Sequence, residues 1–176
     1  MCWGSIEGNF QKNLTDIRIA IAGDLHGSWS QDDLDLLLEL NPDGVLFVGD
    51  LSDGDLRIVR AINKISIPTS VILGNHDRGR DGSGDVLRAQ LDMLGEKNCS
   101  WNLSKWALNE LSVVGARPCS GGGGFFLTPE VKSVFGEVSL DESVFRIVSA
   151  AKSAPLDCPL LILAHSGPVG LGSESS

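Results

Sequence analysis

Two hydrophobic patterns alternate along the first half of the chain. Continuous apolar runs of four or five residues, typical of buried parallel strands, are separated by segments in which an apolar residue recurs every three or four positions, as on one helix face. The predicted strands are Ile17–Ala22, Gly44–Val48, Thr69–Leu73 and, much later, Pro159–Ala164. One predicted helix follows an N-cap at Ser30, and another runs from about Asp55 to Lys64. This β-α-β-α-β order predicts an α/β fold with parallel strands.

The pattern changes after a further helix predicted at Val86–Leu94. Trp106–Leu108 and Leu111–Val114 predict an antiparallel hairpin. A short helix is predicted to begin at Thr128-Pro129, because proline is tolerated in the first turn. A longer helix is predicted from the capping box at Ser139–Glu142. Its predicted buried stripe consists of Val144, Ile147, Val148 and Ala151.

Each of the four apolar runs is followed by side chains that can bind metals. The segments are Gly23-Asp24-Leu25-His26-Gly27, Gly49-Asp50-Leu51-Ser52-Asp53, Gly74-Asn75-His76-Asp77 and Ala164-His165-Ser166-Gly167, and they contain all three histidines of the chain. Sites of open α/β sheets lie at the carboxyl ends of the strands, where these clusters fall. The four clusters together therefore predict one site that binds metal.

Taken singly, each cluster has an ordinary structural explanation. Asp24 and His26 are predicted to point the same way if the segment is extended, although such pairs are also common in turns. The two oxygens of Asp50 suit a bridge between two metals, whereas Asp53 is either a supporting carboxylate or the N-cap of the following helix. Asn75-His76-Asp77 resembles a simple polar turn, but His76 adds a group that exchanges protons near neutral pH.

His165 is the weakest single signal, since a histidine after a buried strand is often structural. Arg78 and Arg117 are candidates for phosphate contact, but ordinary loop solvation is the favoured interpretation for both. The sequence contains no Gly-rich nucleotide-binding motif and no Gly-x-Ser-x-Gly elbow.

Composition narrows the class of protein further. The net charge of −9 disfavours a nucleic acid partner, and no apolar run is long enough to predict a membrane span. The four cysteines show no metal-site spacing, so free thiols in a reducing compartment are expected. Residues 1–16 are interpreted as a polar leader and 17–176 as one domain. Because no signal peptide is recognisable, the predicted location is cytoplasmic, or chloroplast if a transit peptide lies upstream.

Three of these motifs carry a family resemblance. Gly23–Gly27, Gly49–Asp53 and Gly74–Asp77 resemble, in order and spacing, the first three blocks of the calcineurin-like metallophosphoesterase superfamily. Ala164–Gly172 is similar to the next histidine block of that superfamily, and the residues of these blocks are most similar to those of the cyanobacterial and plant branch.

The resemblance implies a four-layer α/β/β/α sandwich and a two-metal site. Asp24 and His26 would bind one metal, Asn75 and His165 the other, and Asp50 both, while His76 would face the leaving group and Asp53 would hold its imidazole. The implied cofactors are two divalent ions, of manganese, iron or zinc. The implied reaction is hydrolysis of a phosphate mono- or diester, on a small molecule or a phosphoprotein, by a metal-bridging hydroxide.

One family block is missing. The family ordinarily ends its site with Gly-His-x-His, yet no histidine follows His165 in this sequence. The expectation is therefore a C-terminally truncated sandwich in which each metal lacks one protein ligand. Two alternatives to an active phosphoesterase stay open, a non-catalytic metal-binding or regulatory module and a scaffold with a vestigial site.

Overall fold

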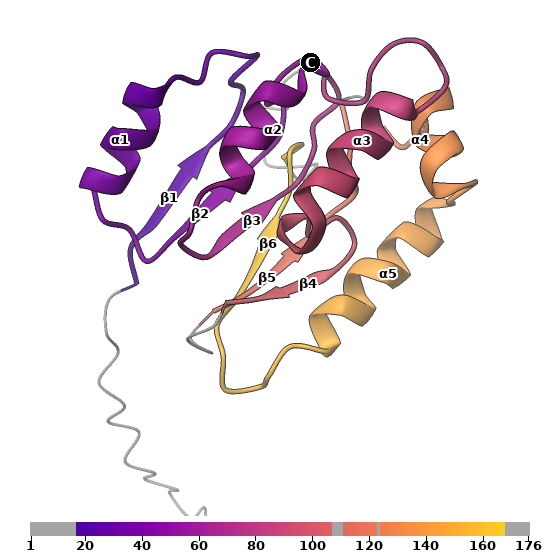
Figure 1. The fold of residues 1–176 in the computed structure, drawn as a ribbon. Helices are drawn as coiled ribbons and strands as arrows, with labels where there is room; N and C mark the ends of the chain where they lie inside the picture. The colour runs from indigo at the N-terminus through magenta and orange to yellow at the C-terminus, as the bar shows by residue number, and fades with distance from the viewer. Residues whose placement is uncertain (1–16, 107–110, 123, 168–176) are drawn as a thin grey trace, which may run out of the picture.

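The computed structural model describes residues 17–106, 111–122 and 124–167. The chain builds two three-stranded sheets and five α-helices within these ranges (Figure 1). The first sheet is parallel, with the order β1-β2-β3, and its strands are β1 (Ile19–Ala22), β2 (Gly44–Phe47) and β3 (Thr69–Val71). The predicted β-α-β-α-β order is thus confirmed. Within the described ranges, no helix combines the length and apolar character needed to cross a bilayer.

The second sheet has the order β4-β5-β6. Its strands are β4 (Leu103–Lys105), β5 (Ser112–Gly115) and β6 (Leu160–Leu163), with β4 antiparallel and β6 parallel to β5. The predicted hairpin therefore exists, but its first strand is misplaced by three residues. Trp106 follows β4 instead of belonging to it, and residues 107–110 lie outside the described part of the chain. The indole of Trp106 is buried against the first sheet, so its apolar signal reflects packing between sheets and not strand pairing.

Four of the five helices begin after a residue whose side chain caps them, and the fifth begins one residue before its predicted start. The five are α1 (Gln31–Glu39), α2 (Leu56–Asn63), α3 (Asp85–Leu94), α4 (Pro129–Phe135) and α5 (Leu140–Lys152), and a 3₁₀ turn, η1 (Gly95–Lys97), follows α3. The hydroxyls of Ser30 and Ser139 and the carboxylate of Asp55 accept hydrogen bonds from first-turn amides. Pro129 occupies the first position of α4.

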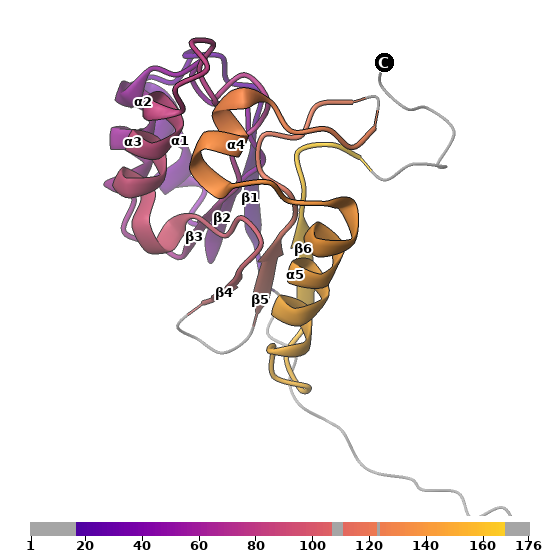
Figure 2. The same ribbon diagram turned by 90° about the vertical axis from the view of Figure 1, so that its right-hand side faces the viewer.

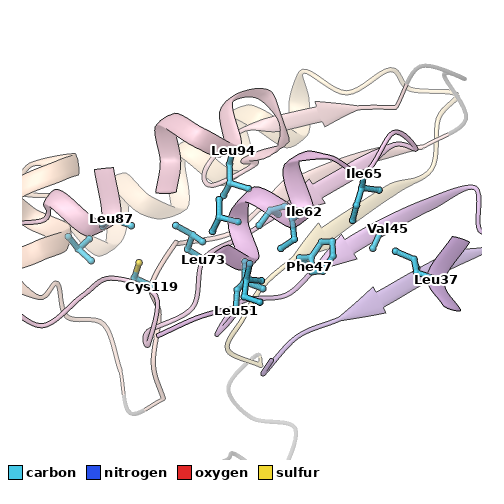
Figure 3. Packing of buried hydrophobic residues seen from close by; sticks show 14 residues of the cluster. Leu37, Val45, Phe47, Leu51, Ile62, Ile65, Leu73, Leu87, Leu94 and Cys119 are labelled. Carbon is cyan, nitrogen blue, oxygen red and sulfur yellow. The ribbon is translucent and has the colours of Figure 1, made fainter. Parts of the chain in front are cut away.

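Two hydrophobic clusters hold these elements in four layers. One cluster lies between the first sheet and its helices and includes Phe47, Ile62 and Leu87 (Figure 3). The other lies between the sheets and joins Ile72 to Val113. Helix α5 contacts β5 on the far side of the second sheet, as Figure 2 shows. The resulting order is helices, sheet, sheet, helix, which confirms the predicted α/β/β/α class.

The approach of the two sheets depends on a glycine. A Cβ built on Gly44 would lie 2.2 Å from the ring of Trp106, so only glycine leaves room for the indole there. The Trp106 Nε1 donates to Ser70 Oγ of β3 at 3.0 Å, which satisfies its buried polar atom. These contacts place the second sheet, and with it the end of β6, against the first.

The predicted stripe on α5 is not buried. Val144 and Val148 are 50% and 42% exposed, Ile147 and Ala151 are only partly buried, and the one buried residue of α5 is Ser143. The β6 strand is also more exposed than its apolar run predicts, since only Leu163 is buried. The β6 strand is exposed because it lies at the edge of its sheet and has one neighbouring strand among the described residues. Helix α5 packs against the middle strand, β5.

Candidate metal centre

The four polar clusters meet at one edge of the two stacked sheets. Asp24, Asp50 and Asn75 follow β1, β2 and β3, and His165 follows β6. The His165 ring reaches the first sheet, with its Nδ1 at 2.8 Å from the Val48 carbonyl. The structure thus brings together loops that are far apart in the sequence.

The first donor set comprises Asp24, His26 and Asp50. One ligand atom from each lies within 4.8 Å of the others. The loop after β1 is held against the loop after β2 by backbone hydrogen bonds, from Asp24 N to Gly49 O at 3.0 Å and from His26 N to Asp50 O at 3.0 Å. The predicted proximity of Asp24 and His26 is therefore observed, but the reason given for it is wrong. The segment is a turn, with φ of 51° at Asp24 and 44° at His26, and is not extended.

The second donor set comprises Asp50, Asn75 and His165. His165 Nε2 lies 3.1 Å from Asn75 Oδ1 and 3.4 Å from Asp50 Oδ2. The Val48 carbonyl can only accept, so His165 Nδ1 donates to it, and Nε2 is the ring nitrogen that faces those two oxygens. An imidazole nitrogen, an amide oxygen and a carboxylate oxygen therefore lie close together, and these are atom types that bind a divalent cation.

Asp50 belongs to both donor sets and is nearly buried. Its Oδ1 accepts a hydrogen bond from the His76 backbone N–H at 2.9 Å, and its Oδ2 faces His165. Glycines make room for it, because a Cβ on Gly74 would lie 2.2 Å from Asp50 Oδ1 and one on Gly49 would lie 2.8 Å from His165 Nδ1. The residues present therefore fit two cations that share one carboxylate.

Asp53 contacts two histidines at once. Its Oδ1 lies 2.9 Å from His76 Nδ1 and 3.3 Å from His26 Nδ1, and the two rings meet edge to face at 4.9 Å. Burial raises the pKa of Asp53, but the hydrogen bonds and charges of His26 and His76 outweigh it and lower the pKa overall. Asp53 does not cap the following helix, because Asp55 does. His26, Asp53 and His76 also form a group able to hold a metal.

Backbone strain is concentrated at these residues. Asp24, His26, Asp50 and Asp53 all have φ between 44° and 51°, in the left-handed region that few non-glycine residues adopt. Such conformations persist where the surrounding structure enforces them, and they are most frequent at functional sites.

Sequence reasoning assigned no role to Asp77, yet it is the most buried carboxylate of the edge. Its side chain accepts hydrogen bonds from three backbone amides, those of Leu51, Ser52 and Gly74. Burial raises the pKa of Asp77, and those amides oppose the shift. The one sequence feature that pointed to Asp77 was its position next to His76 in the third polar cluster.

The two arginines considered for phosphate contact are engaged with the protein. Arg78 donates to the Asn75 carbonyl and lies 3.6 Å from Glu130 Oε2. Arg117 donates to the Phe126 carbonyl at 2.8 Å, with its guanidinium over the Phe125 ring. Both side chains therefore contact protein groups and are not simply solvated, in contrast to the expectation from the sequence.

Comparison with known proteins identifies the class to which this fold and site belong. Residues 17–171 match the family of calcineurin-like phosphoesterases. The chain is therefore a member of that family. Searches of curated proteins and of solved structures found no significant match to the chain.

Proposed function

We propose that this chain is a metal-dependent phosphoester hydrolase that uses two divalent cations sharing Asp50. Membership of the family supports hydrolysis of phosphoesters in general. The observation that carries the proposal is the pair of donor sets, one with Asp24 and His26 and the other with Asn75 and His165, on either side of one nearly buried carboxylate. When bound, such cations neutralise phosphate charge and acidify a water molecule.

Three side chains have separate roles in the proposed reaction, those of His26, Asp53 and His76. Asp53 accepts from His76 Nδ1 and from His26 Nδ1, so it orients both rings and leaves each Nε2 free for its task. For His26 that task is to bind metal. His76 Nε2 gives its proton to the leaving oxygen as the P–O bond breaks. The His76 ring is 38% exposed, which lets a substrate reach it.

The substrate we propose is a phosphate mono- or diester on a small molecule or a protein, with manganese, iron or zinc as the metal. The net charge of −9 argues against nucleic acid, whose phosphate backbone this protein would repel. An anionic substrate would depend on the bound cations for its attraction to the site, since Arg78 and Arg117 are engaged elsewhere.

The test combines metal content with turnover. The protein is stripped with a chelator and reloaded separately with Mn²⁺, Fe²⁺ and Zn²⁺, and hydrolysis of p-nitrophenyl phosphate and bis(p-nitrophenyl) phosphate is measured. Asp50→Asn should lose both metals, whereas Asp24→Asn should weaken one. The matched control is Asp32→Asn, at an exposed carboxylate on α1. Full metal content in Asp50→Asn would contradict the shared ligand.

His76→Ala separates chemistry from binding. It should keep both metals and lower kcat by about 10²–10⁴-fold, as expected for loss of a general acid. If His76→Ala loses metal, His76 is instead a ligand in the group with His26 and Asp53. Tight metal binding by the unmodified protein without turnover of either ester would identify a non-catalytic metal-binding module.

A further inference from the structure

We propose that Asp77 is a positioning residue that sets the direction in which Asp50 presents its carboxylate to the two metals. The inference rests on the proposed function for the role of Asp50. The evidence is that the loop after β2 and the loop after β3 each place one carboxylate against the backbone of the other loop.

The loop after β3 sends Asp77 into the loop after β2. Asp77 Oδ1 accepts from the Leu51 and Ser52 amides at 2.8 and 3.0 Å, immediately after Asp50. Asp77 Oδ2 accepts from Gly74 N at 2.8 Å within its own loop. The Asp77 side chain is inaccessible to solvent, so water cannot replace it as the acceptor for these amides.

The loop after β2 sends Asp50 back into the loop after β3. Asp50 Oδ1 accepts a hydrogen bond from the His76 N–H at 2.9 Å. His76 lies two residues after Gly74, whose own N–H donates to Asp77 Oδ2. Each loop therefore supplies one carboxylate to the other's backbone. Asn75, a candidate ligand of the second metal, lies between Gly74 and His76 and is held by the same contacts.

The exchange explains how the strained turn at Asp50 is maintained. A φ of 51° at Asp50, after 98° at Gly49, turns the Leu51 and Ser52 amides toward a single point. Successive amides that converge in this way form a cradle for negative charge, and Asp77 Oδ1 occupies it. Without that acceptor, two buried donors would lose their partner and the turn would lose the contacts that keep it.

Asp77→Asn tests this with little change of shape. The amide retains one acceptor oxygen, but its NH₂ group must face a backbone N–H, either that of Gly74 or those of Leu51 and Ser52. We expect metal affinity to fall by about 10–100-fold, as found when groups that orient ligands are removed. The readout is metal titration of the chelator-stripped protein, with melting temperature measured in parallel.

The matched control is Ser143→Ala on α5. It also leaves a buried donor without its partner, because Ser143 Oγ accepts from Trp101 Nε1 at 2.8 Å, but on the outer side of the second sheet. Ser143→Ala should lower the melting temperature and leave metal affinity unchanged. If Asp77→Asn lowers the melting temperature while its metal affinity stays within about twofold of the unmodified protein, the positioning role is wrong.

A second measurement needs no variant and holds even if Asp77→Asn fails to fold. In the metal-free protein, hydrogen exchange of the Leu51 and Ser52 amides should be as slow as that of the amides of β2. Exchange as fast as that of exposed loop amides would overturn the proposal. Neither measurement requires turnover, so a protein that binds metal but hydrolyses nothing would refute the proposed function and still test Asp77.

Discussion

Gly74→Ala is the smallest change that should disable the site without removing a ligand. A Cβ at residue 74 would lie 2.2 Å from Asp50 Oδ1, 2.4 Å from Asp50 N and 2.9 Å from Asp50 Cγ. Gly74 does not have a positive φ, so alanine suits its backbone conformation and the whole effect comes from this overlap. Two of the three atoms belong to the Asp50 carboxyl and the third to the backbone, so a rotamer change at Asp50 does not relieve the overlap.

The size of the effect follows from the overlap. Ordinary contact begins at about 3.4 Å, so the loops after β2 and β3 must separate by about 1 Å. Metal–ligand distances tolerate only about 0.2 Å, and a displacement of about 1 Å costs roughly 10²-fold in turnover. We therefore expect kcat/KM to fall by about 10²-fold and metal affinity to fall with it. Overpacking should also cost about 1–3 kcal/mol of unfolding free energy.

The assay compares Gly74→Ala with Gly121→Ala. A Cβ at Gly121 would lie 3.6 Å from Asn75 Cβ, an ordinary contact beside the same site. Gly121→Ala should keep metal affinity and kcat/KM within about twofold of the unmodified protein. Metal titration and hydrolysis of p-nitrophenyl phosphate measure both. If Gly74→Ala retains full metal affinity and turnover, the loops separate without moving Asp50, and the reasoning from close contact fails.

Two further predictions concern the rest of the fold. Burial raises the pKa of Cys99 to about 12 and raises that of Cys119 as well, so iodoacetamide should label Cys158 before either of them in the native protein. Peptide mass spectrometry checks the order, and early labelling of Cys99 would contradict the packing between the sheets. Trp106→Ala should lower the unfolding free energy by about 3–5 kcal/mol, because the indole fills the space between the sheets. Urea denaturation measures this loss, and a change below about 1 kcal/mol would refute it.

The elements were predictable because their signals are local. Ser30, Asp55 and Ser139 each cap a helix whose apolar face follows within one turn. The middle strand of the first sheet, β2, is a continuous apolar run because helices cover one face of the sheet and the second sheet covers the other, whereas Ile21 of the edge strand β1 is 67% exposed. Burial on α5 and β6 was not predictable, since it depends on how far the neighbouring layers extend and not on the periodicity itself.

The candidate ligands were also predictable, because each follows an apolar run that ends at the same edge. What the sequence could not show is how the loops hold one another. An Asp in a polar turn is usually exposed, and only the contact between the loops after β2 and β3 buries Asp77. For the same reason Asp24 and His26 were expected in an extended segment, whereas the backbone turns at both of them.

The left-handed backbone at Asp24, His26, Asp50 and Asp53 has a consequence for evolution and for engineering. Each such conformation costs a non-glycine residue about 1–3 kcal/mol, against a net stability of about 5–15 kcal/mol for a whole domain. Glycine avoids that cost but supplies no ligand. Glycine would also remove the contacts that the Asp50 and Asp53 carboxylates make with His76, so relieving the strain at these positions would cost both ligands and hydrogen bonds. A thermostable variant that keeps its chemistry has to gain stability elsewhere, and must be screened with metal present.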